Sequence, residues 1–289
     1  MANTITLKRR IGSVKNTRQI TKAMELVAAS KMRRAQEQAL HSRVYRQAAY
    51  SLLTRLSSIT EVNEHPLFAK RDVKNRLYLA ITSNQGLAGA YDANILKQLT
   101  HAAKDDIKAG VTPQIIAIGK KGANFSRNLV GVELVAAYTD ISDNPSANDI
   151  RPVLNTITEL FETGQVDEVR LLYTEFKSNL VQIATSLQVL PARFESAEDD
   201  AESIDNVTFE PSVDAVLDNA AIRLIEVQIW QAILESFASE QSMRMMAMKN
   251  ATDNASDLID DLTLAFNTAR QAAITQELAE ITGGAEAIK

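Results

Sequence analysis

Cysteine is absent from this sequence, and aromatic residues make up only 5% of its 289 residues. Without cysteine the chain has no disulfide, no thiolate nucleophile and no thiolate metal ligand. The 45% hydrophobic content is typical of a soluble protein rich in aliphatic helix. No stretch approaches the length of apolar sequence that spans a membrane, and the N-terminus lacks the apolar segment of a secretory signal. We therefore expect a cytoplasmic chain, soluble or peripherally attached.

Glycine and proline are scarce and unevenly distributed. The 71 residues from Ser212 to Thr282 contain neither, and the same holds for residues 13–65. Such stretches predict long helices, because these two residues are the main helix breakers. At the rise of an α-helix the C-terminal stretch alone would be about 105 Å long.

Both stretches repeat apolar and small side chains at alternating intervals of three and four, which is a heptad-type pattern. Many positions are Ala, Thr or Gln where a strong zipper would carry Leu, which favours a thin and closely packed coil. The N-terminal set is Val14, Thr17, Ile20, Met24, Ala28, Met32, Ala35 and Ala39. The C-terminal set is Val213, Leu217, Ala220, Leu224, Val227, Gln231, Leu234, Ala238, Gln241, Met245, Met248, Thr252, Ala255, Ile259, Leu262, Phe266, Ala269 and Ala273.

The charges of the two stretches are opposite. Residues 1–60 carry 12 Lys/Arg and 2 Asp/Glu, whereas residues 210–289 carry 5 Lys/Arg and 13 Asp/Glu. We therefore predict that the two helices pair within the chain as an antiparallel coiled coil. The basic helix could instead bind nucleic acid or an anionic membrane surface. Residues 1–44 contain no aromatic side chain for base stacking, so we favour acidic protein surfaces as its partners.

Short apolar runs alternate with helical patterns between the two long stretches, which indicates an α/β fold with a Rossmann-like, mostly parallel sheet. Helices are expected at Asp92–Ala109, near Ala123–Leu129, and from a capping arrangement at Ser146 and Asp149 through Glu162. An acidic segment at residues 195–206 reads as a loop. The expected strands are Arg76–Thr82, Gln114–Ile118, Val132–Tyr138, Glu168–Glu175, Asn179–Thr185 and Leu187–Phe194.

Motifs for nucleotide, metal or nucleophile chemistry are missing. Gly86 and Gly89 follow a strand but lack the dinucleotide spacing, and the GKKG run at residues 119–122 lacks the spacing and hydroxyl residue of a phosphate loop. The three histidines lie far apart on different elements. We expect no cofactor, no metal and no catalytic activity in the isolated chain.

Three segments resemble the signatures of the gamma subunits of F-type ATP synthases. Ile11–Met32 (IGSVKNTRQITKAMELVAASKM) resembles the N-terminal signature, and Ser242–Ala255 and Asn267–Ile288 resemble two C-terminal signatures in the same order. The middle of the chain matches mainly at ITSNQGLAGAYDANI, where Asn84-Gln85 and Asp92 depart from the family pattern. The cysteine-bearing regulatory insertion of chloroplast members is absent, which excludes a thiol switch.

The resemblance implies a non-catalytic rotor subunit of a proton-translocating complex. Residues 1–65 and 205–289 would form a shaft inside the alpha and beta hexamer, and residues 70–200 a foot beside the epsilon subunit and the membrane c-ring. Rotation of the ring would be coupled to ATP synthesis or hydrolysis at the cytoplasmic face of a bacterial inner membrane. The implied hexamer contacts are Met24, Arg244, Arg270, Gln271 and Thr275. The implied contacts to epsilon and the ring are Leu87, Phe209 and Glu210.

Two other classes remain open at this point. An α/β nucleic-acid-binding module with a helical-hairpin arm would use the basic helix and would bind DNA or RNA in a salt-sensitive manner. An α/β enzyme with such an arm would need a catalytic constellation that the sequence does not contain. If the chain is instead a rotor subunit, it would contact the membrane only through the rotor complex.

Overall fold

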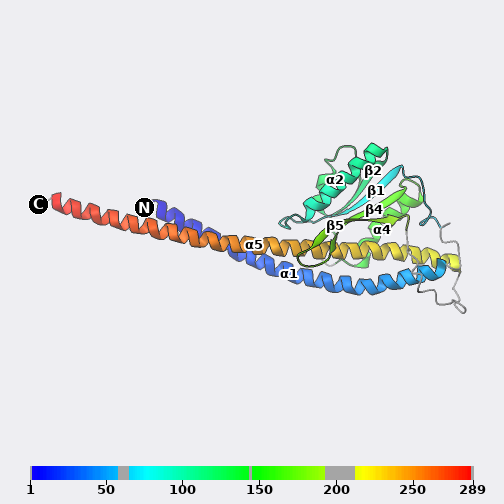
Figure 1. The fold of residues 1–289 in the computed structure, drawn as a ribbon, viewed down its shortest axis with the longest axis horizontal. Coiled ribbons are helices and arrows are strands. Elements are labelled where there is room, and N and C mark those ends of the chain that lie inside the picture. Colours follow the sequence, from blue (N-terminus) through cyan, green and yellow to red (C-terminus); the bar gives the residue numbers. More distant parts are fainter. Residues whose placement is uncertain (1, 58–64, 143–144, 193–211, 288–289) are drawn as a thin grey trace. The chain divides into compact units, whose positions relative to one another are not determined.

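The computed structural model describes residues 2–57, 65–142, 145–192 and 212–287. A long helix comes first, a sheet with three helices follows, and a second long helix ends the chain (Figure 1). The chain divides into two compact units. The coil unit comprises Met1–Ala28 and Arg244–Lys289, and the domain unit comprises Ala29–Met243.

The long helices α1 (Ala2–Ser57) and α5 (Val213–Ala287) confirm the prediction from the glycine- and proline-free stretches. Both extend beyond those stretches, since α1 passes through Gly12 and α5 through Gly283 and Gly284. A glycine inside a helix costs about 1 kcal/mol relative to alanine, which a helix of this length can tolerate. None of the described helices has the length and apolar character needed to cross a bilayer.

The sheet has five strands in the order β3-β2-β1-β4-β5. The first four strands in the chain run parallel, and β5 is an antiparallel edge strand beside β4. This confirms the predicted Rossmann-like, mostly parallel sheet. The strands are β1 (Asn75–Ile81), β2 (Thr112–Ile118), β3 (Glu133–Tyr138), β4 (Glu168–Phe176) and β5 (Gln182–Leu190).

Helices α2 (Tyr91–Ala109), α3 (Lys120–Ser126) and α4 (Ala147–Glu162) connect the parallel strands. Gly110 ends α2 in the left-handed conformation with φ of 78°, where glycine has no steric penalty. The predicted cap of α4 is present, because the Ser146 N–H donates to Asp149 Oδ2 at 2.7 Å. The end of α2 and the start of α4 thus follow from local chemistry visible in the sequence.

Three predicted elements, two strands and one helix, were wrong in their bounds. The separate strands expected at Asn179–Thr185 and Leu187–Phe194 are one strand, β5, which pairs with β4 along its length with one shift of register between Val169 and Arg170. β5 follows a tight turn in which the Lys177 N–H donates to the Val181 carbonyl. Residue 194 lies outside the described residues. The short helix expected at Ala123–Leu129 begins earlier, at Lys120, directly after Gly119.

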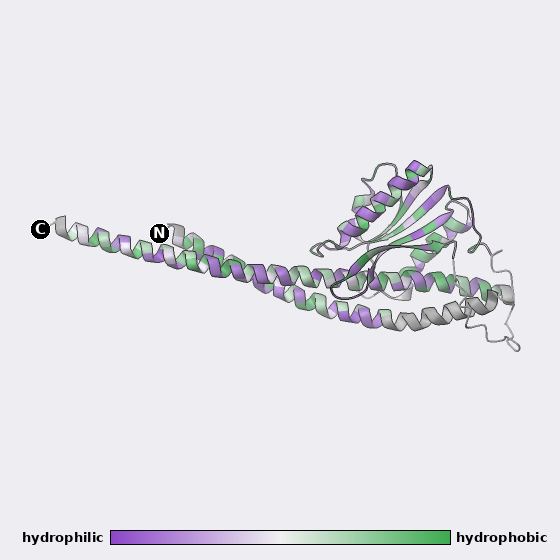
Figure 2. Cartoon of the chain, viewed as in Figure 1, coloured by the Kyte–Doolittle hydropathy of each residue, from purple (hydrophilic) through white to green (hydrophobic). Residues whose placement is uncertain are grey.

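Buried apolar side chains cover both faces of the sheet. The hydrophobic residues along its strands are green in Figure 2. Alternation along β1 sends Leu77, Leu79 and Ile81 to one face and Tyr78 and Ala80 to the other. The first face packs against α4 and α5, and the second against α2. The α5 members of the first cluster are Leu217, Ala220, Ala221, Leu224, Ile225, Ile229, Ala232 and Ile233.

The coil unit confirms the predicted seam of α5. Ala255 and Ile259 are buried, and from residue 260 to residue 273 only every third or fourth side chain is partly covered, while residues 274–285 are all exposed. Those partly covered residues are Leu262, Phe266, Ala269 and Ala273. The contact stripe is therefore narrow, as the alanine-rich pattern predicts.

The predicted seam of α1 is wrong by one residue at its centre. Thr17 is exposed and Ile20 is 60% exposed, whereas Thr21 is buried. The Thr21 and Thr252 hydroxyls form a hydrogen bond of 2.8 Å between the two helices. Ile20 and Thr21 both fit a three-and-four spacing, and hydrophobicity alone favoured the isoleucine. The helices instead meet through the small hydroxyl pair.

This register predicts a specific cross-link. Because the chain has no cysteine of its own, Thr21→Cys with Thr252→Cys should form a disulfide within the monomer on mild oxidation, as the two side chains meet. The control pair, Ile20→Cys with Thr252→Cys, moves one thiol a single residue around the helix and should remain reduced. Equal cross-linking of both pairs on non-reducing gels would contradict the register.

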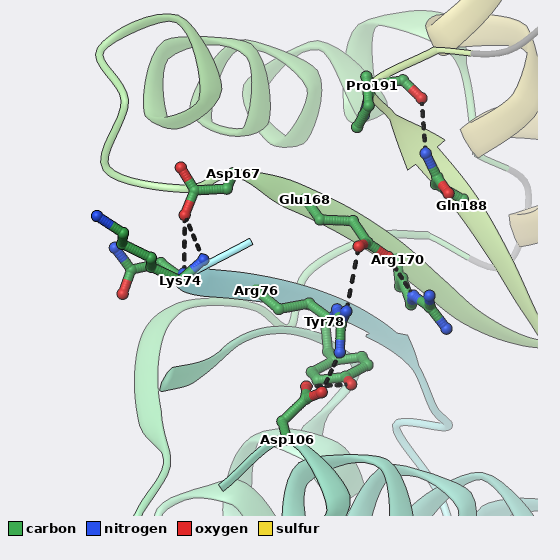
Figure 3. Close-up of polar contacts among 10 residues, drawn as sticks. Lys74, Arg76, Tyr78, Asp106, Asp167, Glu168, Arg170, Gln188 and Pro191 are labelled. Carbon is green, nitrogen blue, oxygen red and sulfur yellow. Dashed lines mark hydrogen bonds and ion pairs between the residues drawn. The ribbon is translucent and has the colours of Figure 1, made fainter. Parts of the chain in front are cut away.

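A buried ionic cluster joins the starts of β1 and β4 to the end of α2 (Figure 3). Arg76 donates to Asp106 and, at 3.2 Å, to Glu168, which also accepts from Arg170. The Tyr78 hydroxyl donates to Asp106 at 2.5 Å. Burial, followed by this bond, raises the pKa of Tyr78 above its ordinary value of 10.0. The stabilisation from the protonated phenol is therefore complete below pH 10.0 and is lost as the pH rises above that value.

Asp106→Asn tests how much this cluster contributes to the free energy of unfolding. Removing one member of a buried pair leaves a buried charge poorly compensated, so we expect the free energy of unfolding to fall by about 3 kcal/mol. Trp230, the single tryptophan, packs against the core of the domain unit and reports unfolding in urea by fluorescence. The matched control is Asp105→Asn, because the Asp105 side chain is 74% exposed in a surface pair with Lys108. A similar loss in both variants would refute the role of the cluster.

Candidate partner-contact site

Three predicted contact residues share one exposed side of α5 in the coil unit. Arg270, Gln271 and Thr275 are all exposed, and they lie away from the partly covered Ala269 and Ala273. The Thr275 hydroxyl donates to the Gln271 carbonyl at 3.0 Å. The Arg270 guanidinium and the Gln271 amide thus supply directional hydrogen-bonding groups on this side of the helix.

Apolar side chains continue this exposed side. Ile274, Leu278 and Ile281 are exposed, with Leu278 at 59% and Ile281 at 68%. They recur at intervals of four and three, so they form a second stripe that the coil does not cover. Sequence analysis missed them as contact residues. Their signal was visible, since they are large apolar residues that fall outside the heptad seam.

Further exposed apolar residues occur on both helices of the coil unit. They include Ile20, Leu26 and Val27 of α1 and Leu258 and Leu264 of α5. Isolated exposed apolar residues are normal, but repeated large ones along a helix pair indicate a surface that other proteins cover. The coil unit therefore carries two kinds of apolar residue, one covered in its seam and one exposed on its surface.

Met24 and Arg244 also belong to the coil unit. Met24 is partly covered, so part of its flexible thioether side chain is available to a partner. Arg244 is only 7% exposed and is largely enclosed within the chain. Of the five residues expected at a hexamer, Arg244 is thus the least accessible, and a partner would reach only its exposed remainder.

Leu87 stands out in the turn after β1. It is 63% exposed and has φ of 65°, a conformation that costs energy for a residue with a side chain. Such strain persists only where the surrounding structure enforces it, and it is common at functional positions. The turn therefore presents a leucine to solvent at a fixed orientation.

Hydrogen bonds hold that turn in shape, including the residues that depart from the family pattern. Asp92 accepts from the Ser83 N–H at 2.8 Å and from the Ser83 hydroxyl at 2.6 Å. Asn84 accepts from the Lys120 N–H at 3.0 Å. Asn84 and Asp92, the residues that depart from the family pattern, thus stabilise the turn through side-chain hydrogen bonds.

The GKKG run is a packing motif against Thr82. Gly119 has φ of 95°, and a side-chain carbon there would lie 2.1 Å from the Thr82 carbonyl oxygen. A Cβ atom added at Gly122 would lie 2.7 Å from Thr82 Oγ1. This oxygen accepts a hydrogen bond from the Gly122 N–H at 2.8 Å. Glycine at these positions lets the α3 start lie close to β1, which explains the run without a phosphate.

Phe209 and Glu210, the other two residues expected at the foot, lie outside the described residues. Across the part of the chain that the structure describes, no group of three or more His, Asp or Glu side chains is arranged to hold a metal ion. The described candidate surfaces are therefore two: the exposed side of the coil unit and the Leu87 turn.

The sequence matches a known family over nearly its full length. The profile of the family described as ATP synthase matches residues 3–288. The ATP synthase gamma chain of Heliobacterium modesticaldum is 41% identical over 98% of both chains. That of Acidithiobacillus ferrooxidans is also 41% identical, over 100% of both chains.

Solved structures agree on the fold. A rotational state of the Euglena gracilis mitochondrial ATP synthase contains a chain with a TM-score of 0.69 and 19% identity, covering 99% of this chain and 95% of that one. The central stalk and c-ring structure of the Tetrahymena thermophila mitochondrial enzyme contains one with a TM-score of 0.61 and 23% identity, covering 80% of this chain and 99% of that one. Because these sequence matches cover the full length, the chain belongs to the ATP synthase gamma-chain family.

Proposed function

We propose that this chain is the central rotor shaft of a bacterial F-type ATP synthase, coupling proton-driven rotation of the membrane ring to ATP synthesis or hydrolysis in the alpha and beta hexamer. The observation that carries this proposal is the 41% identity to gamma chains over the full length. The alternative of a nucleic-acid-binding module with a helical arm receives no such support.

The parts of the chain divide the task. Residues 1–65 and 205–289 serve as the shaft, and residues 70–200 serve as the foot. The chain itself is non-catalytic, and it affects ATP chemistry only by favouring different conformations of its neighbours in turn. This role needs stiffness and a shaped surface, and it needs no nucleotide site within the chain.

The coil unit contacts the hexamer. Met24, Arg244, Arg270, Gln271 and Thr275 contact the catalytic and non-catalytic subunits. A shaft that must release each neighbour in turn benefits from apolar contacts that slide, combined with few directional hydrogen bonds. The apolar stripe of Ile274, Leu278 and Ile281 beside Arg270 and Gln271 has this composition.

The foot meets the rest of the rotor. Leu87, Phe209 and Glu210 contact the epsilon subunit and the c-ring, and the exposed Leu87 side chain supplies an apolar anchor for this interface. The chain is thereby held peripherally at the cytoplasmic face of the inner membrane through the rotor complex.

Reconstitution tests the rotor role. Membrane vesicles with c-ring and stator are combined with alpha, beta and epsilon subunits, with or without this chain, and acidification on ATP addition is followed by a fluorescent dye. We expect ATP-driven acidification only when the chain is present, because nothing else links the hexamer to the ring. Equal acidification without it would contradict the proposal, and salt-sensitive binding of the chain to tRNA would favour the module.

Met24→Lys tests the contact near an acidic segment of the catalytic subunit that the family resemblance implies. A lysine there would add a charge-assisted hydrogen bond of about 1.5–3 kcal/mol to a shielded carboxylate and would hold the shaft too long in some orientations. Assembly and nucleotide binding should survive, while protons pumped per ATP hydrolysed should fall. Met24→Leu, which keeps the volume without the charge, is the control. Substituting Arg244 to remove its charge should partly restore coupling, and normal pumping by Met24→Lys would show that the contact is misassigned.

A further inference from the structure

The order of the strands in the sheet reverses direction between β1 and β4. From β1 the chain moves outward through β2 to β3, and it then returns to β4 on the other side of β1. In open α/β sheets the carboxyl ends of the strands at such a point form the crevice where ligands bind. β1 and β4 flank this crevice, and part of α5 lies against it.

At this crevice β4 continues after its pairing with β1 has ended. The ladder between them finishes at Ala80 and Leu172, while β4 extends to Phe176. Backbone groups of β4 beyond Leu172 that point toward β1 therefore need other partners, because buried N–H and C=O groups are almost always paired.

Two serines of α5 supply those partners. The Thr174 N–H donates to Ser236 Oγ at 2.9 Å, and the Ser239 hydroxyl donates to the Thr174 carbonyl at 3.2 Å. Both serines are fully buried. The hydroxyls thus take the place that a longer β1 would occupy at the edge of β4.

A third serine extends the contact to the turn between β4 and β5. The Ser242 hydroxyl donates to the Asn179 carbonyl at 3.0 Å and accepts from Gln182 Nε2 at 3.2 Å. On the β1 side, a side-chain carbon at Gly89 would lie 3.9 Å from the Met243 carbonyl oxygen. The loops after both strands therefore lie against α5.

The serines begin where the apolar packing of α5 on the sheet ends. The last α5 residue in the apolar cluster is Ile233, and Ser236, Ser239 and Ser242 follow at intervals of three. Apolar contacts have no preferred direction, so alone they allow a helix to slide or turn slightly on a sheet. Hydrogen bonds to fixed backbone groups define its axial position, since they weaken steeply with misalignment.

We propose that Ser236, Ser239 and Ser242 form a torsional joint that fixes α5 against the foot, so that torque applied to the foot reaches the shaft without slippage. The crevice where other open α/β sheets bind a ligand holds the chain's own helix. This inference rests on the proposed rotor function and assigns positioning residues to it.

The joint is tested in the assembled complex with the three serines changed to alanine. Lys108→Cys on the exposed surface of α2 gives a unique thiol for a nanorod in this cysteine-free chain. With the hexamer fixed to a surface and nucleotide absent, we expect the angular variance of the rod to rise about twofold or more, because four directional hydrogen bonds are lost. Ser256→Ala is the matched control, since among the described residues the Ser256 hydroxyl bonds only to the Thr252 carbonyl of its own helix.

Amide exchange gives a second readout that does not require the triple variant. In the full chain, Ser236→Ala alone should accelerate hydrogen exchange at Thr174 by about tenfold, because that N–H loses its acceptor. Ser256→Ala should leave this exchange rate unchanged. Unaltered exchange at Thr174 would overturn the assigned contact.

The outcomes separate the joint from the rotor role. Rotation of the triple variant on ATP addition with the angular variance of the unmodified chain would overturn the joint and leave the proposed function standing. A complex that carries the three serines and hydrolyses ATP without turning the rod would contradict the proposed function itself.

Discussion

The burial of α5 between Leu217 and Gln241 is the interaction on which the rest of the structure depends. Four side chains before Leu224 are exposed, but from Leu224 to Gln241 every side chain is covered, including polar ones such as Gln228 and Gln231. A helix buried on most sides cannot show a simple amphipathic pattern, and apolar and polar residues are interspersed along it (Figure 2). The helix is thus part of the core of the domain unit, and its continuation carries the coil unit.

The coil unit shows how little apolar contact such a shaft uses for itself. Its seam consists largely of single covered residues at every third or fourth position, and large apolar side chains remain outside it. A wider seam would stabilise the coil further but would consume the surface that partners need. The helix pair therefore keeps a stable register through small residues and one hydroxyl pair while leaving apolar surface for its neighbours.

Much of this architecture could be predicted from the sequence, because long-range order here follows from simple patterns. The lack of glycine and proline predicted both long helices, and alternating strands and helices predicted the parallel sheet. The central phase of α1 could not be predicted, since Ile20 and Thr21 compete for the seam and hydrophobicity favours the residue that the structure exposes. The close approach of α3 to Thr82 likewise depends on tertiary contacts that no local pattern reveals.

Functional surfaces were predictable only through resemblance to a family. Arg270, Gln271 and Thr275 carry no local motif, and the structure adds only that they share an exposed side of α5. The Leu87 conformation and the buried serines of α5 required coordinates, because a strained φ and a hydrogen bond to a distant strand leave no spacing signal. Large apolar residues outside the heptad seam were the one sign of a contact surface that was already present in the sequence.

The central claim is that the chain turns inside a stationary hexamer. It is tested most directly by watching a rod attached at Lys108→Cys while ATP is added to a surface-fixed complex of the hexamer and this chain. The account predicts continuous rotation in one direction that stops when ATP is removed. A rod that keeps a fixed mean orientation while the same complexes hydrolyse ATP would contradict it.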